Sequence, residues 1–338
     1  MILSGPDRHN EEAGPPTAGR LLIPIGLKPS HVRASRINAP VRRLSGATMG
    51  TGWSLAFAAP DSVQNSAVVA ALEETFALVI GQMSGWEPRS DLSRFNRANR
   101  SWHDLSEDFF VVLTRALEIA NLTGGFYNPA LAARMDLLGF GPALDHPCGS
   151  GSWRDIEVDA ANRRAFQPGG VALDLSSIAK GHAVDLCASR LRALGIPSFL
   201  MEIGGEFVGE GVKPDGQPWW IELELCDIGQ APGEPRHTDV ALVGHAIATS
   251  GDFVRRREGV CHLLDGRTGA PLRGELSGVS VIHPSAMEAD GWATALFALG
   301  ADEGMAMADA QRLAAIFATR TSEGARSQLS AKAREMLG

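Results

Sequence analysis

The chain has 338 residues, of which 44% are hydrophobic and 21% charged, and its formal net charge is -8. This composition is typical of a globular protein that can bury a core as one large domain or two smaller ones. Because the net charge is negative and no long basic run is present, we expect no nucleic-acid partner. We also expect no transmembrane segment, because no stretch is apolar over the roughly 20 residues that a bilayer requires.

The cysteines and the N-terminal segment bear on the compartment. Cys148, Cys187, Cys226 and Cys261 form no C-x-x-C pair, which argues against a structural zinc site and fits a reducing compartment. The first residues show neither an apolar signal-peptide region nor a small-residue cleavage site. We therefore expect a cytoplasmic protein as the sequence is written, or a periplasmic one if its start site is misassigned.

Three regions are predicted along the chain. Residues 1–42 are rich in Pro, Gly and Arg, and are predicted to be a partly disordered tail with a candidate docking segment near Leu21. Residues 43–320 are predicted to form the folded domain. Residues 321–338 are polar and are predicted to be a mobile C-terminal tail.

The folded region shows helical and strand-like patterns in runs. Apolar spacing and turn residues predict helices at 63–82, 107–121, 285–299 and 303–319, and a short helix at 130–139. The predicted strands are 53–58, 219–225, 240–250 and 279–283, with a hairpin over 156–171. Because strands and helices do not alternate strictly, the sequence favours an α+β fold over a doubly wound sheet.

The stretch 171–211 is the most informative part of the chain. It predicts a short strand ending at residues 174–177, a helix over 178–194 and a second strand over 198–203. Ser176 or Ser177 is a candidate N-cap of that helix. Free backbone N–H groups, the positive end of the helix dipole and Lys180 would make the helix start a seat for phosphate, although no Walker motif is present.

Several residues can carry chemistry, and each also has a structural interpretation. Asp290 and Thr294 lie four apart on a predicted helix, so their oxygens share a face and suit a hard cation. Spacing alone favours the alternative, a helix-start Asp and a Thr bonded back to the helix backbone. His262 ends a predicted strand and is either a general base or a partly buried structural histidine. Met49 and Trp86 either bracket a flat ring or simply pack.

Eight segments, taken in order, resemble the FAD:protein FMN transferase (ApbE) family from about Arg43 to Arg320. They are Met49-Gly50-Thr51, Met83-Ser84 with Ser90–Asn96, Gly139-Phe140-Gly141, Leu173–Asp185, Gly204-Gly205, Ala248–Asp252, His262–Gly269 and Ala289-Asp290 with Thr294. The resemblance implies an α+β, T-fold-like architecture with mixed or antiparallel sheets and packed helices.

The resemblance also implies an activity. A member of this family uses Mg²⁺ to cleave FAD and attaches FMN covalently to a Thr or Ser of a target flavoprotein, releasing AMP. Two alternatives use the same residues: an Mg²⁺-dependent FAD pyrophosphatase that gives FMN and AMP, and a non-catalytic FAD-binding protein.

The family's site residues map onto this chain by motif. Asp290, the Thr294 hydroxyl and the backbone carbonyl of Ser177 would bind the metal, and His262 would deprotonate the acceptor hydroxyl. The positions that would line FAD are Met49, Trp86, Phe126, Tyr127, Asn128, Asp174, Lys180 and Leu264. The chain departs from the family pattern at Asn128, His182, Glu202, Glu206 and Gly266, where Asp, Tyr, Asn, Asp and Pro are common.

Overall fold

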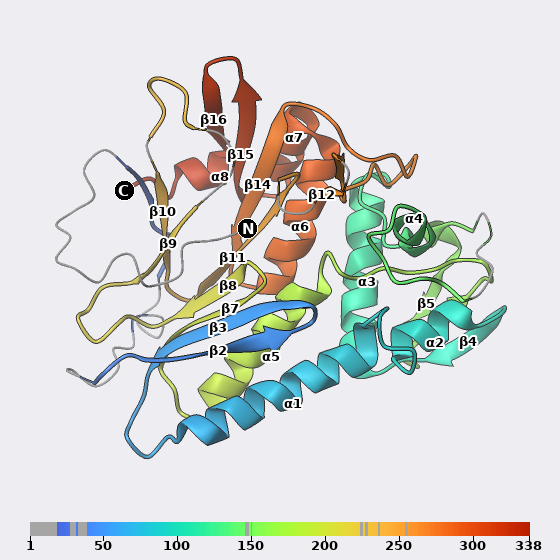
Figure 1. The fold of residues 1–338 in the computed structure, drawn as a ribbon, viewed down its shortest axis with the longest axis horizontal. Coiled ribbons are helices and arrows are strands. Elements are labelled where there is room, and N and C mark those ends of the chain that lie inside the picture. The colour runs from blue at the N-terminus through green and yellow to red at the C-terminus, as the bar shows by residue number, and fades with distance from the viewer. Residues whose placement is uncertain are drawn as a thin grey trace.

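An eight-stranded antiparallel sheet forms the centre of the protein (Figure 1). The computed structural model describes residues 19–27, 32, 39–145, 149, 151–223, 226, 229–235, 237–253, 256–257 and 259–338. In spatial order the strands are β16 (Gly324–Leu329), β15 (Ala314–Thr321), β14 (Leu276–His283), β11 (His245–Gly251), β8 (Glu206–Glu210), β7 (Ser198–Ile203), β3 (Thr51–Ala58) and β2 (Arg42–Thr48).

This sheet is covered on both faces, so most residues of its central strands are buried whichever face they point to. Along β7 and β8, Met201 and Val208 enter the larger core beneath the helices, whereas Leu200 and Phe207 enter a second core on the opposite face. The alternation follows the two-residue period of a strand.

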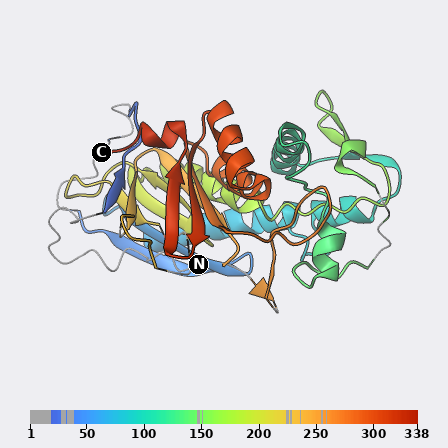
Figure 2. The same cartoon turned by 90° about the horizontal axis from the view of Figure 1, so that it is seen from above.

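One face packs against helices and the other against a small sheet (Figure 2). The helices are α1 (Asn65–Met83), α3 (Glu107–Leu122), α5 (Ala179–Ala193), α6 (Ala286–Leu299) and α7 (Ala301–Ala310). The opposite layer comprises β1 (Arg20–Leu22), β10 (Thr238–Leu242), β9 (Trp219–Glu222) and α8 (Ala331–Arg334).

A smaller lobe lies beyond the end of α1, on the side of the helices away from the sheet in both views (Figures 1 and 2). It contains α2 (Asp91–Arg97), α4 (Ala132–Leu137), the 3-10 turn Trp153–Asp155, and the sheet of β4 (Ser101–Asp104), β6 (Arg164–Gln167) and β5 (Glu157–Asp159). A two-stranded ribbon, β12 (Arg256–Arg257) and β13 (Val260–Cys261), leads into the loop that carries His262.

The α+β architecture predicted from the sequence is confirmed, and most elements lie where the periodicity places them. The predicted helix 303–319 is half wrong, because α7 ends at Ala310 and Ala314–Thr321 is β15. Short apolar runs do not distinguish a buried strand from a helix, and here pairing with β14 decides. The predicted strand 240–250 is two strands, β10 and β11, separated by a turn at Gly244, whose φ is 65°.

The two predicted tails also contain ordered elements. In the segment near Leu21, β1 pairs in parallel with β10. Residues 321–338 are not a mobile tail, because β16 pairs with β15 along its length and α8 follows. Of the predicted strand 219–225, residues 224 and 225 lie outside the described residues.

One described helix, α1, is long and apolar enough by composition to cross a membrane, contrary to the expectation from the sequence. In this fold it lies along the sheet and against α5, and Val68, Leu72 and Phe76 are buried in the larger core. These apolar side chains of α1 therefore pack inside the fold, although only 33% of its apolar window is buried.

The crossing of α5 and α6 positions the candidate site. A Cβ at Gly181 would stand 2.7 Å from Asp290 Cβ and closer still to the carbonyl oxygen of Ala286, so only glycine permits this approach. Asp185 of α5 then caps α6, because its carboxylate accepts the Ser285 hydroxyl at 2.6 Å and the N–H groups of Ala286 and Met287 at 2.8 and 3.0 Å. A carboxylate at a helix N-terminus is favoured by the dipole as well as by these bonds.

We expect Gly181→Ala to destabilise the protein by about 1–3 kcal/mol, because the added methyl group must push α5 and α6 apart. Gly81→Ala is the matched control, since a Cβ there on α1 meets no atom within 4 Å. It should stabilise by roughly 0.5–1 kcal/mol. Urea unfolding of both variants measures this difference, and equal stabilities would contradict the close helix crossing.

Candidate active site

The segment before α5 is irregular and is fixed by a buried asparagine. Asn96 of α2 donates to the Leu173 carbonyl at 2.9 Å and accepts the Leu173 N–H at 2.8 Å. The predicted strand at 171–177 is therefore absent, since this backbone bonds to a side chain instead of to a sheet. Asn96 was not among the predicted site residues, although a polar residue on the buried face of α2 was a usable signal.

The start of α5 differs from the prediction in its cap. Ile178 occupies the N-cap position without a side-chain bond, so neither Ser176 nor Ser177 caps the helix. Instead, Ser177 Oγ donates to Tyr127 Oη at 3.0 Å, and the Asp174 carboxylate accepts the Ser176 N–H at 2.8 Å. The backbone of the helix start is thus not closed off by its own serines.

Asp290 is buried at this helix start, with 4% of its surface exposed. Its Oδ2 accepts the Gly181 N–H at 2.9 Å, a bond from the first turn of α5 to the middle of α6. Burial raises the pKa of the Asp290 carboxyl, while the Lys180 charge and the Gly181 N–H act in the opposite direction. One turn along α6, Thr294 Oγ1 lies 2.8 Å from Ser250 Oγ of β11.

Tyr127 connects these groups to the small lobe. Its side chain is buried and lies close enough to two carboxylates to feel their charge. Burial raises the pKa of Tyr127 most strongly, and the charges of Asp290 and Asp174 act in the same direction. Ser177, Tyr127, Asp174 and Asp290, which are far apart in sequence, therefore converge at the start of α5.

Lys180 does not stand free at this helix start. Its Nζ lies 2.5 Å from Oε1 of Glu206, the first residue of β8. The neighbouring Glu202 accepts the Ser54 hydroxyl at 3.1 Å and the Gly205 N–H at 2.9 Å. The Gly204-Gly205 turn is thus held by side chains around it, and it brings a second carboxylate to the lysine.

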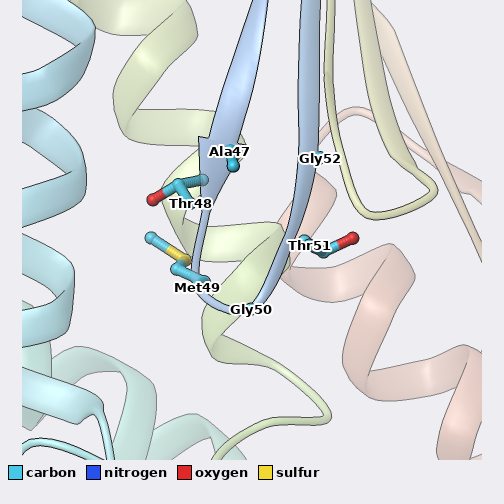
Figure 3. Close-up of a pocket in the computed structure, with 6 residues that line it drawn as sticks. All are labelled: Ala47, Thr48, Met49, Gly50, Thr51 and Gly52. Atoms are coloured by element: carbon cyan, nitrogen blue, oxygen red, sulfur yellow. The ribbon is translucent and has the colours of Figure 1, made fainter.

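The β2–β3 turn adjoins this region. Gly204 N–H donates to the Gly52 carbonyl at 3.0 Å, and an open hollow at the turn is lined by residues 47–52. Figure 3 shows the Thr48 and Met49 side chains on one side of the turn and Thr51 on the other. Met49 has a φ of 50°, and its side chain packs against the edge of the larger core.

The remaining predicted FAD-lining residues lie on loops of the small lobe. Trp86 is 67% exposed on the α1–α2 loop. The Arg267 guanidinium lies 3.5 Å from the centre of the Phe126 ring. Asn128 donates to the Gly266 carbonyl at 2.7 Å and accepts the Ala130 N–H at 2.8 Å, so its amide joins two loops.

His262 and Leu264 belong to the loop that Asn128 fastens. Gly266 N–H donates to the Phe126 carbonyl at 3.0 Å, and a Cβ at Gly266 would stand 2.5 Å from that same oxygen. Leu264 is buried and bridges to Pro271, while the His262 ring lies 6.2 Å from the Phe140 ring between centres. The His262 loop is therefore docked on the segment whose Tyr127 reaches Ser177.

The sequence profile of the ApbE family matches residues 49–317. The chain belongs to the ApbE family. The family resemblance noted in the sequence is thereby confirmed.

Relatives and solved structures extend over most of the chain. The FAD:protein FMN transferase of Vibrio cholerae is 31% identical over 83% of this chain and 88% of its own, and that of Haemophilus influenzae is 30% identical over 83% and 87%. The apo crystal structure of the Pseudomonas stutzeri flavinyl transferase ApbE has a TM-score of 0.78 and 29% identity, covering 89% of this chain and 98% of that one. The fold is thus that of the ApbE flavin transferases.

Glu206 gives this region a pH dependence. Burial raises the pKa of its carboxyl from 4.5 to about 8. The Glu206 carboxyl therefore binds its proton more tightly in the folded state than in the unfolded chain. The protonated carboxyl stabilises the folded state fully below about pH 4.5, and this contribution is lost as the pH rises to about 8. We expect the melting temperature of the metal-free, FAD-free protein to fall between about pH 5 and about pH 8, and to fall less in Glu206→Gln. Identical pH profiles for the two proteins would mean that the Glu206 carboxyl is exposed to water and keeps its ordinary pKa.

Proposed function

We propose that this flavin transferase cleaves the diphosphate of FAD and attaches FMN to a Thr or Ser hydroxyl of an acceptor flavoprotein, with release of AMP. The relatives support the reaction, since they are named FAD:protein FMN transferases. The observation that carries the proposal is the buried Asp290 carboxylate, which accepts the Gly181 N–H in the first turn of α5, next to Lys180. A helix start of this kind suits phosphate, and a carboxylate beside it suits a bridging cation.

The residues present fit a Mg²⁺ ion. Asp290, the Thr294 hydroxyl and the Ser177 carbonyl would supply oxygen ligands, which Mg²⁺ prefers. No three His, Cys, Asp or Glu side chains in the described part of the chain form a metal-binding group, so neutral oxygens would have to complete the set. When bound, Mg²⁺ would neutralise the developing charge on the diphosphate.

The local charge supports the same assignment. Glu202, Glu206 and Asp290 surround Lys180 closely enough that each acts on the lysine's charge. Three carboxylates and one ammonium leave two negative charges when all are ionised. Buried charge of one sign is costly, and a divalent cation would balance it.

The protein's other groups have distinct roles in the proposed reaction. Lys180 and the positive end of the α5 dipole would hold the diphosphate, while Met49 and the exposed Trp86 would bracket the flavin ring. His262 would take the proton of the acceptor hydroxyl. The acceptor oxygen then forms a bond to the phosphorus of the FMN half, and the phosphorus–oxygen bond to AMP breaks.

Water is the competing nucleophile. Trp86 is 67% exposed, so the flavin side of the site is open both to a protein and to solvent. An FAD pyrophosphatase would use the same residues, with water in place of the hydroxyl. A non-catalytic FAD-binding protein would retain FAD without releasing AMP.

The purified protein with FAD, Mg²⁺ and candidate acceptor domains tests the reaction. We expect mass spectrometry to find FMN on a Thr or Ser of one acceptor, and AMP release to depend on that acceptor. FMN and AMP appearing equally fast without an acceptor would favour the pyrophosphatase instead.

We expect Asp290→Ala to abolish FMN transfer while the circular-dichroism spectrum stays native, because the main metal ligand is removed. Titration with Mn²⁺ by calorimetry gives a readout independent of turnover, and the variant should lose the binding seen in the wild-type protein. Transfer by Asp290→Ala in the presence of a chelator would refute the metal assignment.

We expect His262→Ala to slow transfer by roughly 10²–10⁴-fold, as the loss of a general base does. FAD affinity, measured by flavin fluorescence, should change far less. Equal losses in rate and affinity would indicate that His262 binds the substrate and does not move a proton.

A further inference from the structure

Two ion pairs join α5 to β8, and they differ in their surroundings. At the far end of the helix, Arg192 and Glu210 meet at 2.9 Å, with 50% of the arginine and 15% of the glutamate side chain exposed. At the start of the helix, Lys180 and Glu206 meet at 2.5 Å, with 28% of the lysine and 4% of the glutamate side chain exposed. The same two elements thus carry two ion pairs, and the pair at the candidate site is the more buried of the two.

Glu206 is poorly placed for stability. Its Oε2 is buried and has no hydrogen-bond partner among the described residues. Burial raises the pKa of the carboxyl, and the charges of Asp290 and Glu202 act in the same direction against the opposing effect of Lys180. An unsatisfied buried carboxylate oxygen destabilises a fold, so a stabilising role does not explain this residue.

The position of Glu206 is nevertheless tightly fixed. It follows Gly204 and Gly205, whose φ angles of 63° and 103° favour glycine. That turn is held by the Gly204 bond to Gly52 and by the Glu202 carboxylate, which accepts the Gly205 N–H at 2.9 Å. The hairpin therefore presents the Glu206 carboxylate to the first turn of α5 at a defined place.

We propose that Glu206 is a positioning residue, which holds the Lys180 ammonium at the start of α5 where the FAD diphosphate binds. This inference rests on the proposed function of Lys180. An ammonium has three donors, and Glu206 Oε1 engages one, which leaves two for phosphate oxygens. Lysine is flexible, so a lysine that is ordered before FAD arrives removes that ordering cost from binding.

A competing role for Glu206 would change FAD affinity in the opposite direction. A carboxylate that merely competes with phosphate for Lys180 would weaken FAD binding, and its removal would tighten it. A carboxylate that positions the lysine strengthens binding, and its removal weakens it. The direction of the change therefore separates the two roles.

The test compares Glu206→Gln, Lys180→Met and the double variant by fluorescence titration with FAD and Mg²⁺ without acceptor, at a pH above 8 where the Glu206 carboxyl is ionised. We expect Glu206→Gln to raise the FAD dissociation constant about tenfold, or ~1.4 kcal/mol, because a neutral amide holds the ammonium less firmly. The double variant should bind FAD no more weakly than Lys180→Met, since Glu206 acts through the lysine. The melting temperature of Glu206→Gln at pH 8 should be unchanged or higher, whereas a purely structural residue would lower it.

Glu210→Gln is the matched control, because it makes the same chemical change in the other ion pair between the same elements. It should alter FAD affinity less than about twofold. Tighter FAD binding by Glu206→Gln, additive losses in the double variant, or a melting temperature that falls together with affinity would each overturn the positioning role. An unchanged affinity of Lys180→Met would do the same. The proposed function fails separately, if the wild-type protein releases no AMP from FAD with any acceptor.

Discussion

The bond from the Gly181 N–H to the Asp290 carboxylate is the contact on which the rest of the site depends. It exists only because α5 and α6 cross without a side chain between them at Gly181. A second glycine allows another close helix contact. On α6, a Cβ at Gly291 would stand 2.9 Å from the side chain of Ile119 on α3. The cap that Asp185 places on α6 joins the same two helices a second time, and Asp290 lies on α6 one turn after this cap.

The electrostatics of the site are unfavourable for the isolated protein. Asp290, Glu202 and Glu206 are largely removed from water near a single lysine, and burial raises the pKa of each carboxyl. Natural proteins place groups that oppose stability at functional sites and compensate for them elsewhere. Here the compensation includes the two large cores and the bidentate pair of Arg115 with Glu288, at 2.7 Å for both bonds, which ties α3 to α6.

The sequence predicted those parts of the site that depend on local spacing. The i, i+4 pair Asp290 and Thr294 lies on one helix as expected, and the ordered motifs indicated the family. Residues 314–319 were predicted to continue a helix because an apolar run has no clear period, and only pairing with neighbouring strands identifies them as part of β15. Ser176 or Ser177 was expected to cap α5, but neither does, and the Ser177 hydroxyl bonds to Tyr127, fifty residues earlier in the chain. The Lys180–Glu206 pair was likewise not predictable, since tertiary packing alone brings those side chains together.

The central claim is that Asp290 and the start of α5 hold one cation against the FAD diphosphate. Crystals grown with FAD and Mn²⁺ test it most directly, because manganese gives an anomalous signal at a site that suits Mg²⁺. We expect an anomalous peak about 2.0–2.2 Å from an Asp290 carboxylate oxygen, with the Ser177 carbonyl and a diphosphate oxygen as further ligands. Manganese bound elsewhere while FAD occupies the site, or FAD bound with its diphosphate away from α5, would contradict the account.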